Sequence, residues 1–140
     1  MWIIWNKTQL GKNMYAIGGN IEAAEVSGVN IVKNILIIFL ISGILYGLAG
    51  YLEAARVGST TSNTGLNYDL DAISASVIGG VSFSGGIGTI PGVIIGAIIL
   101  QFINYGLAYV GVNPNYQYII KGLIIILAVA IDVRKYIKRK

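Results

Sequence analysis

The stretch from Asn34 to Leu52, NILIIFLISGILYGLAGYL, contains no charged residue. As a helix rising about 1.5 Å per residue, it nearly matches the ~30 Å hydrocarbon core of a bilayer. This stretch restricts the fold more than any other feature, because it predicts a transmembrane helix. Only 11% of the 140 residues are charged and 55% are hydrophobic, which leaves too few charges to cover a soluble domain of this size. We therefore expect an all-α, polytopic transmembrane helical bundle that forms a single membrane domain.

A second uncharged stretch, from Ala72 to Ile120, is too long for a single crossing. The turn-forming sequences SGGIGTIPG and GVNPN divide it into three pieces. The first piece is a short apolar segment around DAISASVIGGVSF, which we extend at both ends, and the last piece continues past Ile120 into a span that includes Lys121. Together with the first span, the predicted membrane segments are residues 34–52, 69–84, 92–110 and 116–132.

Charge placement predicts the orientation of these segments. The C-terminal sequence DVRKYIKRK holds five basic residues and three lysines precede the first span, whereas the loop 53–71 has a single basic residue, Arg56. By the positive-inside rule both ends are cytoplasmic and this loop is external, which requires an even number of crossings and favours about four. A re-entrant dip for residues 69–84 stays open, because its apolar piece is short for a full crossing.

One short polar helix is predicted at residues 20–29, near the start of this apolar chain. Asn20 is a suitable N-cap, Glu22 lies in the first turn where the helix dipole favours a negative charge, and Gly28 can end the helix. We expect a flexible IGGN segment before it. A helix this short is marginal in water and needs a surface to dock on. From the residues alone, a protein partner and an ordinary cytoplasmic connector are equally good interpretations.

Four segments of the chain resemble the permeases of bacterial ABC importers in the ribose/galactose and branched-chain amino acid group. They are GKNMYAIGGNIEAAEVSGVNI, LISGILYGLAGYLEAARVGS, LDAISASVIGGVSFSGGIGT and INYGLAYVGVNPNYQYIIKGLIIILAVAIDV. The resemblance covers essentially the whole chain in one order and is strongest to galactose-type permeases. Members of the group are roughly twice this length, so the chain resembles the C-terminal half of one.

The resemblance implies a transmembrane permease component that imports galactose, methyl-galactoside or a related monosaccharide by alternating access. A separate cytoplasmic ABC ATPase would use the ATP, so this chain needs no cofactor. The other implied partners are a periplasmic or extracellular sugar-binding protein, a second permease copy and the lipid bilayer of the bacterial plasma membrane. The implied ATPase-coupling residues are Asn20, Glu22, Ala23, Ala24, Glu25, Ser27 and Gly28. Glu25 departs from the group, whose members usually have a basic residue there.

The chain lacks the residues of most catalytic and metal sites. It has no histidine and no cysteine, and LGKN at residues 10–13 lacks the upstream glycine and the hydroxyl of a phosphate-binding loop. We therefore predict neither an enzyme nor a metal site. The net charge of +4 fits orientation in a bilayer, and we expect no nucleic-acid partner.

A polar stripe interrupts the third apolar segment, where Gln101, Asn104 and Tyr105 are spaced to lie on one side of a helix. They either line a path for a hydroxyl-rich sugar or form hydrogen bonds between helices, and the second interpretation is favoured. Lys121 is expected to extend its ammonium outward to the membrane surface. The small-residue pairs Gly43/Gly47 and Gly92/Gly96 predict close helix packing.

Two other functions remain alternatives. A self-contained secondary transporter or channel would need ionisable residues inside the membrane, and only Lys121 lies well away from the ends of a predicted span. A truncated permease fragment without transport activity would also have this sequence.

Overall fold

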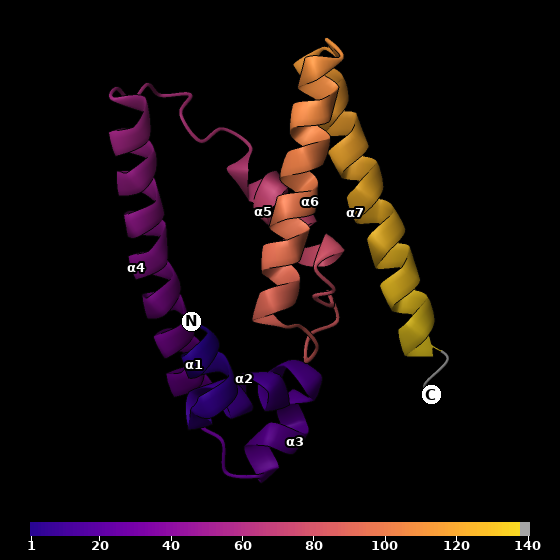
Figure 1. The fold of residues 1–140 in the computed structure, drawn as a ribbon. Coiled ribbons are helices and arrows are strands. Elements are labelled where there is room, and N and C mark those ends of the chain that lie inside the picture. The colour runs from indigo at the N-terminus through magenta and orange to yellow at the C-terminus, as the bar shows by residue number, and fades with distance from the viewer. Residues whose placement is uncertain (138–140) are drawn as a thin grey trace.

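The computed structural model describes residues 1–137, and all of its regular elements there are α-helices. The chain passes from three short helices to one long helix, then a short helix, then two long ones, as Figure 1 shows. The helices are α1 (Trp2–Lys7), α2 (Gln9–Gly19), α3 (Ile21–Val26), α4 (Ile31–Val57), α5 (Tyr68–Ile78), α6 (Ile90–Tyr109) and α7 (Pro114–Ile137).

The helices form three groups in space (Figure 1). The short helices α1, α2 and α3 pack against one another at one end of the molecule. From this base α4 rises alone, whereas α5 packs closely against α6 and also contacts α7. The loop between α4 and α5 crosses at the opposite end, so α4 and α6 stand as two separate columns above α1–α3.

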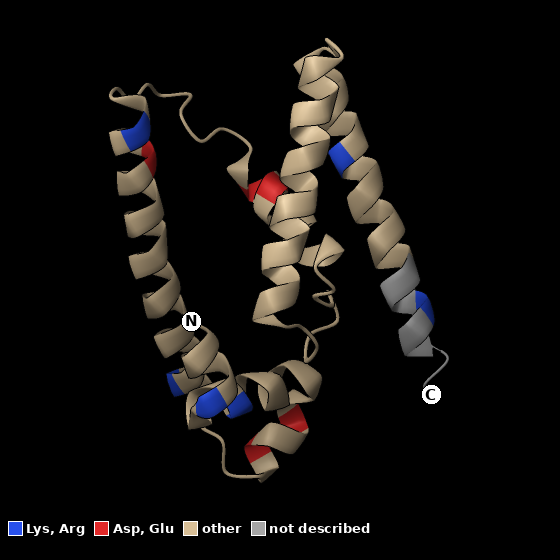
Figure 2. Ribbon diagram, in the orientation of Figure 1, with Lys and Arg blue, Asp and Glu red and all other residues tan. Residues whose placement is uncertain are grey.

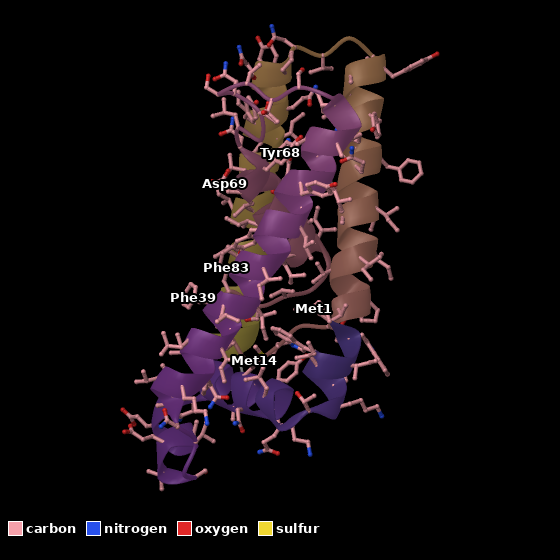
Figure 3. All side chains as sticks on the ribbon, turned by 90° about the vertical axis from the view of Figure 1, so that its left-hand side faces the viewer. Met1, Met14, Phe39, Tyr68, Asp69 and Phe83 are labelled. Carbon is pink, nitrogen blue, oxygen red and sulfur yellow. The ribbon has the colours of Figure 1, made fainter. Side chains whose placement is uncertain are left out.

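The helix α4 contains the predicted span 34–52 and extends it at both ends. Its N-cap Asn30 accepts a hydrogen bond from the backbone N–H of Lys33, and it ends at Gly58, whose φ of 74° suits glycine. None of its most apolar 18-residue window is buried inside the protein. Figure 3 shows Phe39 on this helix projecting away from the rest of the chain. Such a surface needs hydrocarbon or another apolar chain around it.

Within the described residues 1–137, two helices are long and apolar enough to cross a membrane, α4 and α6, and α7 contains a shorter apolar stretch, Pro114–Ala130. The predicted segment 92–110 coincides closely with α6, and the predicted segment 116–132 lies within α7. Helical membrane insertion therefore fits the described part of the chain.

The predicted segment 69–84 is only partly helical. α5 ends at Ile78, and Gly80 follows with a φ of 83°, a conformation that only glycine adopts at no cost. The chain then continues as an irregular loop, residues 79–89, until Thr89 caps the start of α6. This loop returns to α2 rather than ending beside α5 (Figure 1).

Glycines allow α5 and α6 to approach backbone to backbone. A Cβ atom at Gly96 would lie 2.6 Å from the backbone nitrogen of Gly79, and one at Gly79 would lie 2.8 Å from Cα of Val93. The expected close packing of Gly92/Gly96 is therefore confirmed. The pair Gly43/Gly47 differs, since a Cβ at either position would meet nothing within 4 Å.

The base of the molecule is more regular than the sequence predicts. The segment IGGN was expected to be flexible, but Ile17, Gly18 and Gly19 complete α2 as helix and only Asn20 is extended. The helix continues through both glycines because the backbone N–H of Asn20 still donates to the carbonyl of Ala16. A compact turn, rather than a mobile linker, therefore joins α2 to α3.

Candidate functional site

The short helix α3 has the local structure that its sequence predicts. Asn20 adopts an extended conformation, and its Oδ1 accepts a hydrogen bond of 3.0 Å from the backbone N–H of Ala23. Glu22 lies in the first turn, where the helix dipole stabilises its charge. At the other end, Ser27 Oγ donates to the carbonyl of Ala23, and Gly28 takes a φ of 80°. Residues 20–28 therefore form a compact helical turn with both ends closed.

Exposure divides the predicted coupling residues of α3 into two sets. Ala24 is 3% exposed and packs inward, so it can only position the helix. The others project from the base of the molecule and are exposed: Asn20, Glu22, Ala23, Glu25, Ser27 and Gly28. Figure 2 shows the acidic residues of α3 at the same end of the molecule as the basic residues of α1, α2 and the start of α4.

Two apolar residues of α3 also lie on this surface. Val26 is 91% exposed and Ile21 is 56% exposed, although both sit on a helix only six residues long. Neither residue is among the coupling residues that the sequence predicts. An uncovered valine and isoleucine on a small capped helix are suited to a protein partner with an apolar groove.

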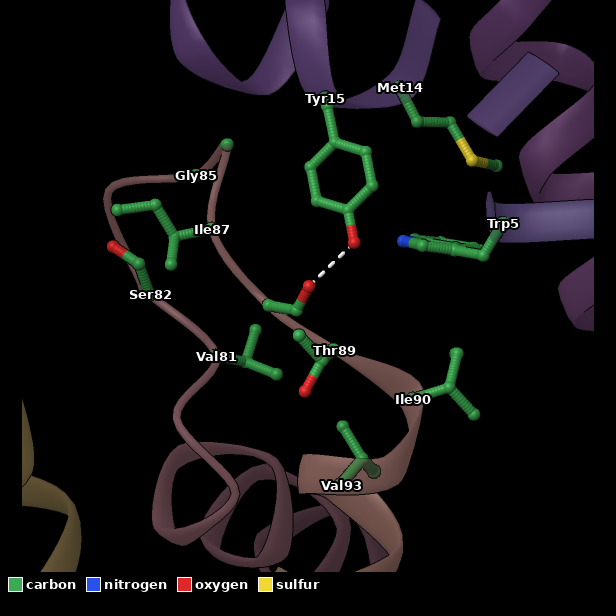
Figure 4. Close-up of a pocket in the computed structure, with 12 residues that line it drawn as sticks. Trp5, Met14, Tyr15, Val81, Ser82, Gly85, Ile87, Thr89, Ile90 and Val93 are labelled. Carbon is green, nitrogen blue, oxygen red and sulfur yellow. Dashed lines mark hydrogen bonds between the residues drawn. The ribbon is translucent and has the colours of Figure 1, made fainter. Parts of the chain in front are cut away.

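The helix α2 connects α3 to two other parts of the molecule. Asn13 Nδ2 donates to Oδ1 of Asn34, which is buried at the start of α4. On another side, Tyr15 donates its hydroxyl proton to the carbonyl of Gly88 in the loop 79–89, at 2.5 Å. Figure 4 shows this hydrogen bond beside Trp5, whose ring meets that of Tyr15 edge to face.

A cavity of about 200 Å³ lies between α1, α2 and the loop 79–89. Its lining is largely apolar, as Figure 4 shows for Trp5, Met14, Val81, Ile87 and Val93. The walls offer few hydrogen-bonding groups to a sugar. The cavity therefore marks where the base meets the loop and has no features of a substrate site.

An ion pair joins α5 to α7. Lys121 Nζ lies 2.5 Å from Oδ1 of Asp71, and the side chains are 9% and 33% exposed. The expectation that Lys121 extends outward to the membrane surface is therefore wrong. A carboxylate on the facing helix neutralises the ammonium, so the charge stays inside the bundle.

Other buried polar atoms lie in the same group of helices. Ser74, one turn after Asp71 on α5, is 0% exposed, and its Oγ has no hydrogen-bond partner. Asn104 Oδ1 on α6 is also buried without one. Buried polar groups are normally paired, so both atoms are acceptors available to a water or a hydroxyl.

The polar stripe on α6 does not form one enclosed site. Gln101 and Tyr105 are exposed, whereas the oxygen of Asn104 is buried. Gln101 and Tyr105, four residues apart, share one face of the helix, and Asn104 lies at the edge of that face. Asn104 therefore differs from Gln101 and Tyr105 in its environment, because its side-chain oxygen is buried and the other two residues are exposed.

At the far end of α4, a small polar cluster links α4 to α5. Arg56 donates two hydrogen bonds to the carboxylate of Glu53, at 2.8 and 3.1 Å, and the Tyr68 hydroxyl donates a third. The Arg56 and Tyr68 hydrogen bonds lower the pKa of Glu53, and the same carboxylate raises the pKa of Tyr68. This cluster holds the start of α5 to the end of α4.

Apolar helices long enough to cross a membrane, joined to a group of short helices at one end, are typical of the class of helical membrane proteins. The chain belongs to the family described as "Branched-chain amino acid transport system / permease component", which matches residues 1–129. This agrees with the resemblance seen in its sequence.

Curated relatives in this family are similar over the whole chain. The galactose/methyl galactoside import permease protein of Haemophilus influenzae is 63% identical over 140 residues, and that of Escherichia coli is 61% identical. Each alignment covers 100% of this chain and 42% of the relative. The ribose import permease protein of Escherichia coli is 46% identical over 134 residues, covering 96% of this chain and 42% of the relative. The chain thus spans about two fifths of the length of these relatives. No solved structure matches it.

Proposed function

We propose that the chain is part of the transmembrane permease of an ABC importer for galactose, methyl-galactoside or a related monosaccharide. Its helices move sugar inward by alternating access, and a separate ATPase supplies the energy. The permease itself is not an enzyme. The identity of 63% to a galactose/methyl galactoside import permease supports the sugar class.

The observation that carries this proposal is the exposed helix α3. Six of its seven predicted coupling residues face outward, together with Val26, on a helix that a side-chain cap closes. A cytoplasmic ABC ATPase is the partner we assign to residues 20–29. Glu25 is exposed on this surface, so we expect the ATPase to place a basic or neutral group opposite it.

The arrangement of the helices supports a topology of four crossings. α4 leads away from the base, α5 with the loop 79–89 leads back to it, and α6 and α7 repeat the pair (Figure 1). We propose that both ends are cytoplasmic in the bacterial plasma membrane and that the loop 53–71 is external. A periplasmic or extracellular sugar-binding protein delivers substrate there, and a second permease copy completes the pathway.

The exposed face of α6 is the part of the sugar path that we assign to this chain. Gln101 and Tyr105 present an amide and a phenol there, groups that hydrogen-bond sugar hydroxyls. Asn104 keeps the role that its buried oxygen favours, a polar contact within the helix group.

Co-purification of the ATPase from membranes tests the docking role of α3. Replacing Ala23 with Trp and Val26 with Asp alters the exposed surface and leaves the buried Ala24 in place. Both changes should abolish ATPase binding, because one adds bulk and the other a charge at the contact. Ala55→Trp, exposed at the far end of α4, is the matched control and should retain binding. Unchanged binding in the α3 variants would refute the docking role.

The alternatives predict different energy sources. The Lys121–Asp71 pair gives a secondary transporter the ionisable residues that it would need inside the membrane. Uptake of labelled galactose should stop when the ATPase gene is deleted and persist when the proton gradient is collapsed. The reverse result would favour the secondary transporter, and no uptake from the intact operon would favour a fragment without transport activity.

A further inference from the structure

We propose that α2 and the loop 79–89 form a rigid backbone junction that passes the movement of α3 to the start of α6. The proposal rests on the proposed function, in which an ATPase docks on α3. It assigns Gly18 and Tyr15 as positioning residues for transport, in contact with neither the ATPase nor the sugar.

The junction consists of two Gly-Gly pairs in direct contact. A Cβ at Gly18 would lie 2.6 Å from the backbone nitrogen of Gly86, and a Cβ at Gly86 would lie 2.9 Å from Cα of Gly19. Real Cβ atoms do not approach so closely, so neither position can accept a side chain unless the two segments move apart. Gly85 and Gly86 also take φ values of 88° and 71°, which glycine adopts without strain.

A hydrogen bond holds this contact in place. Tyr15, one turn before Gly18 on α2, donates to the carbonyl of Gly88 at 2.5 Å (Figure 4). Two segments about 70 residues apart in the sequence therefore meet through backbone atoms and one short hydrogen bond.

The junction is continuous with the docking helix on one side. Asn20 ends α2, where its backbone N–H donates a hydrogen bond to the carbonyl of Ala16. The same residue begins α3, where its side-chain oxygen accepts a hydrogen bond from the backbone N–H of Ala23. Since one residue serves both helices, a displacement of α3 is also a displacement of the end of α2, where Gly18 lies.

The junction is continuous with α6 on the other side. The loop closes on itself through a hydrogen bond from the backbone N–H of Ser82 to the carbonyl of Ile87. Thr89, next to Gly88, caps α6 by accepting from the N–H of Gly92. α6 in turn contacts the backbone of α5 at Gly79.

Backbone contacts transmit displacement more directly than contacts between long side chains. Side chains can change rotamer and absorb a shift, whereas closely packed backbone atoms have no such freedom and low compressibility. A displacement that the ATPase imposes on α3 is therefore transmitted to α5 and α6 almost unreduced.

A matched pair of alanine substitutions in the intact transporter tests the junction. Gly18→Ala places a methyl group against Gly86, while Gly19→Ala, the next residue of the same helix, meets nothing within 4 Å. The measurement is sugar transported per ATP hydrolysed in proteoliposomes containing the ATPase and binding protein. We expect this ratio to fall about tenfold for Gly18→Ala and to stay at the parental value for Gly19→Ala, with ATPase binding equal in both.

A second variant adds no volume and so cannot fail by distorting the fold. Tyr15→Phe removes the hydrogen bond to Gly88, and Tyr46→Phe on the exposed surface of α4 is its control. The same ratio should fall for Tyr15→Phe only.

If Gly18→Ala and Tyr15→Phe both keep the parental ratio of sugar transported per ATP hydrolysed, the proposed junction is wrong. It is also wrong if a fall is fully explained by lost ATPase binding, since the residues would then position α3 alone. If the unaltered chain binds no ATPase, the proposed function itself fails, which is a different result from either.

Discussion

At the scale of single residues, the pair Asp71–Lys121 places a buried charge in the bundle. Removing one partner leaves the other buried without a counter-charge, which costs about 3–5 kcal/mol. We predict that Asp71→Asn lowers the stability of the chain in detergent by about this amount, because the ammonium of Lys121 is 9% exposed. Thermal unfolding followed by circular dichroism measures the loss.

Two controls show whether the ion pair causes that loss. Asp69→Asn changes an exposed carboxylate on the same helix and should have little effect. The double replacement Asp71→Leu with Lys121→Met removes both charges and should recover most of the stability. A double variant as unstable as Asp71→Asn would contradict the prediction.

At the scale of helices, the contact between α5 and α6 depends on the absence of side chains. Gly96→Val should lower the melting temperature of the chain markedly, since even a Cβ there would meet the backbone nitrogen of Gly79 at 2.6 Å. Gly43→Val puts the same side chain into open space on α4 and should leave it unchanged. Equal melting temperatures for the two variants in detergent would show that the α5–α6 contact is loose.

The link between α4 and α5 at Glu53 should depend on pH. Hydrogen bonds from Arg56 and Tyr68 hold the pKa of Glu53 below its ordinary value. A depressed pKa means that the stabilisation is fully present above the ordinary carboxyl pKa and is lost as pH falls through the lowered one. Infrared titration of the Glu53 carboxylate band follows this loss.

Removing one hydrogen bond donor tests the cause of that shift. Tyr68→Phe should move the titration of Glu53 toward higher pH, while Tyr51→Phe, exposed on α4, should not move it. If both variants titrate like the parent, Tyr68 does not bind Glu53 in solution.

Local patterns explain which helices were predictable from the sequence. The uncharged stretch 34–52, the Asn20 cap and the turns before α6 and α7 all depend on neighbours a few residues away. The end of α5 at Ile78 was not predictable, because Gly-Gly occurs both inside helices, as at the end of α2, and after them. What ends α5 is the positive φ of Gly80, a conformation that the sequence permits but does not require.

The candidate site was predictable only where it is local. The exposure of α3 follows from its composition, but the burial of Ala24 depends on packing that the segment does not show. Pairing of Asp71 with Lys121 joins residues 50 positions apart, so no local pattern indicates it. The contact between Gly18 and Gly86 was not predicted either, although the Gly-Gly pairs 18–19 and 85–86 indicate places where two backbones can approach closely.

At the scale of the whole molecule, the proposed orientation predicts which residues meet each aqueous phase. The chain has no cysteine, so a single introduced thiol reports its own location. In intact spheroplasts, Ser62→Cys in the exposed loop after α4 should react with a membrane-impermeant maleimide. Val26→Cys on α3 should react only after the membrane is opened, because we place it in the cytoplasm.

A reporter fused after Lys140 provides an independent check and should read cytoplasmic. An external reading of the fusion, or labelling of Val26→Cys in intact cells, would rule out four crossings with both ends inside. Labelling of Ser62→Cys only after opening would invert the topology.

The isolation of α4 has a consequence for the surrounding lipid. Hydrogen bonds from Asn13 at its foot and Tyr68 at its head hold the helix, while no part of its most apolar window is buried between them. The uncharged stretch 34–52 of this helix measures about 28 Å and matches the ~30 Å hydrocarbon thickness of an ordinary bilayer. In a thinner bilayer the stretch is too long, and such a mismatch is relieved by tilting. The acyl-chain length of the lipid therefore sets the tilt of α4. Because α4 and α6 form the two separate columns, a change in bilayer thickness changes the distance between them.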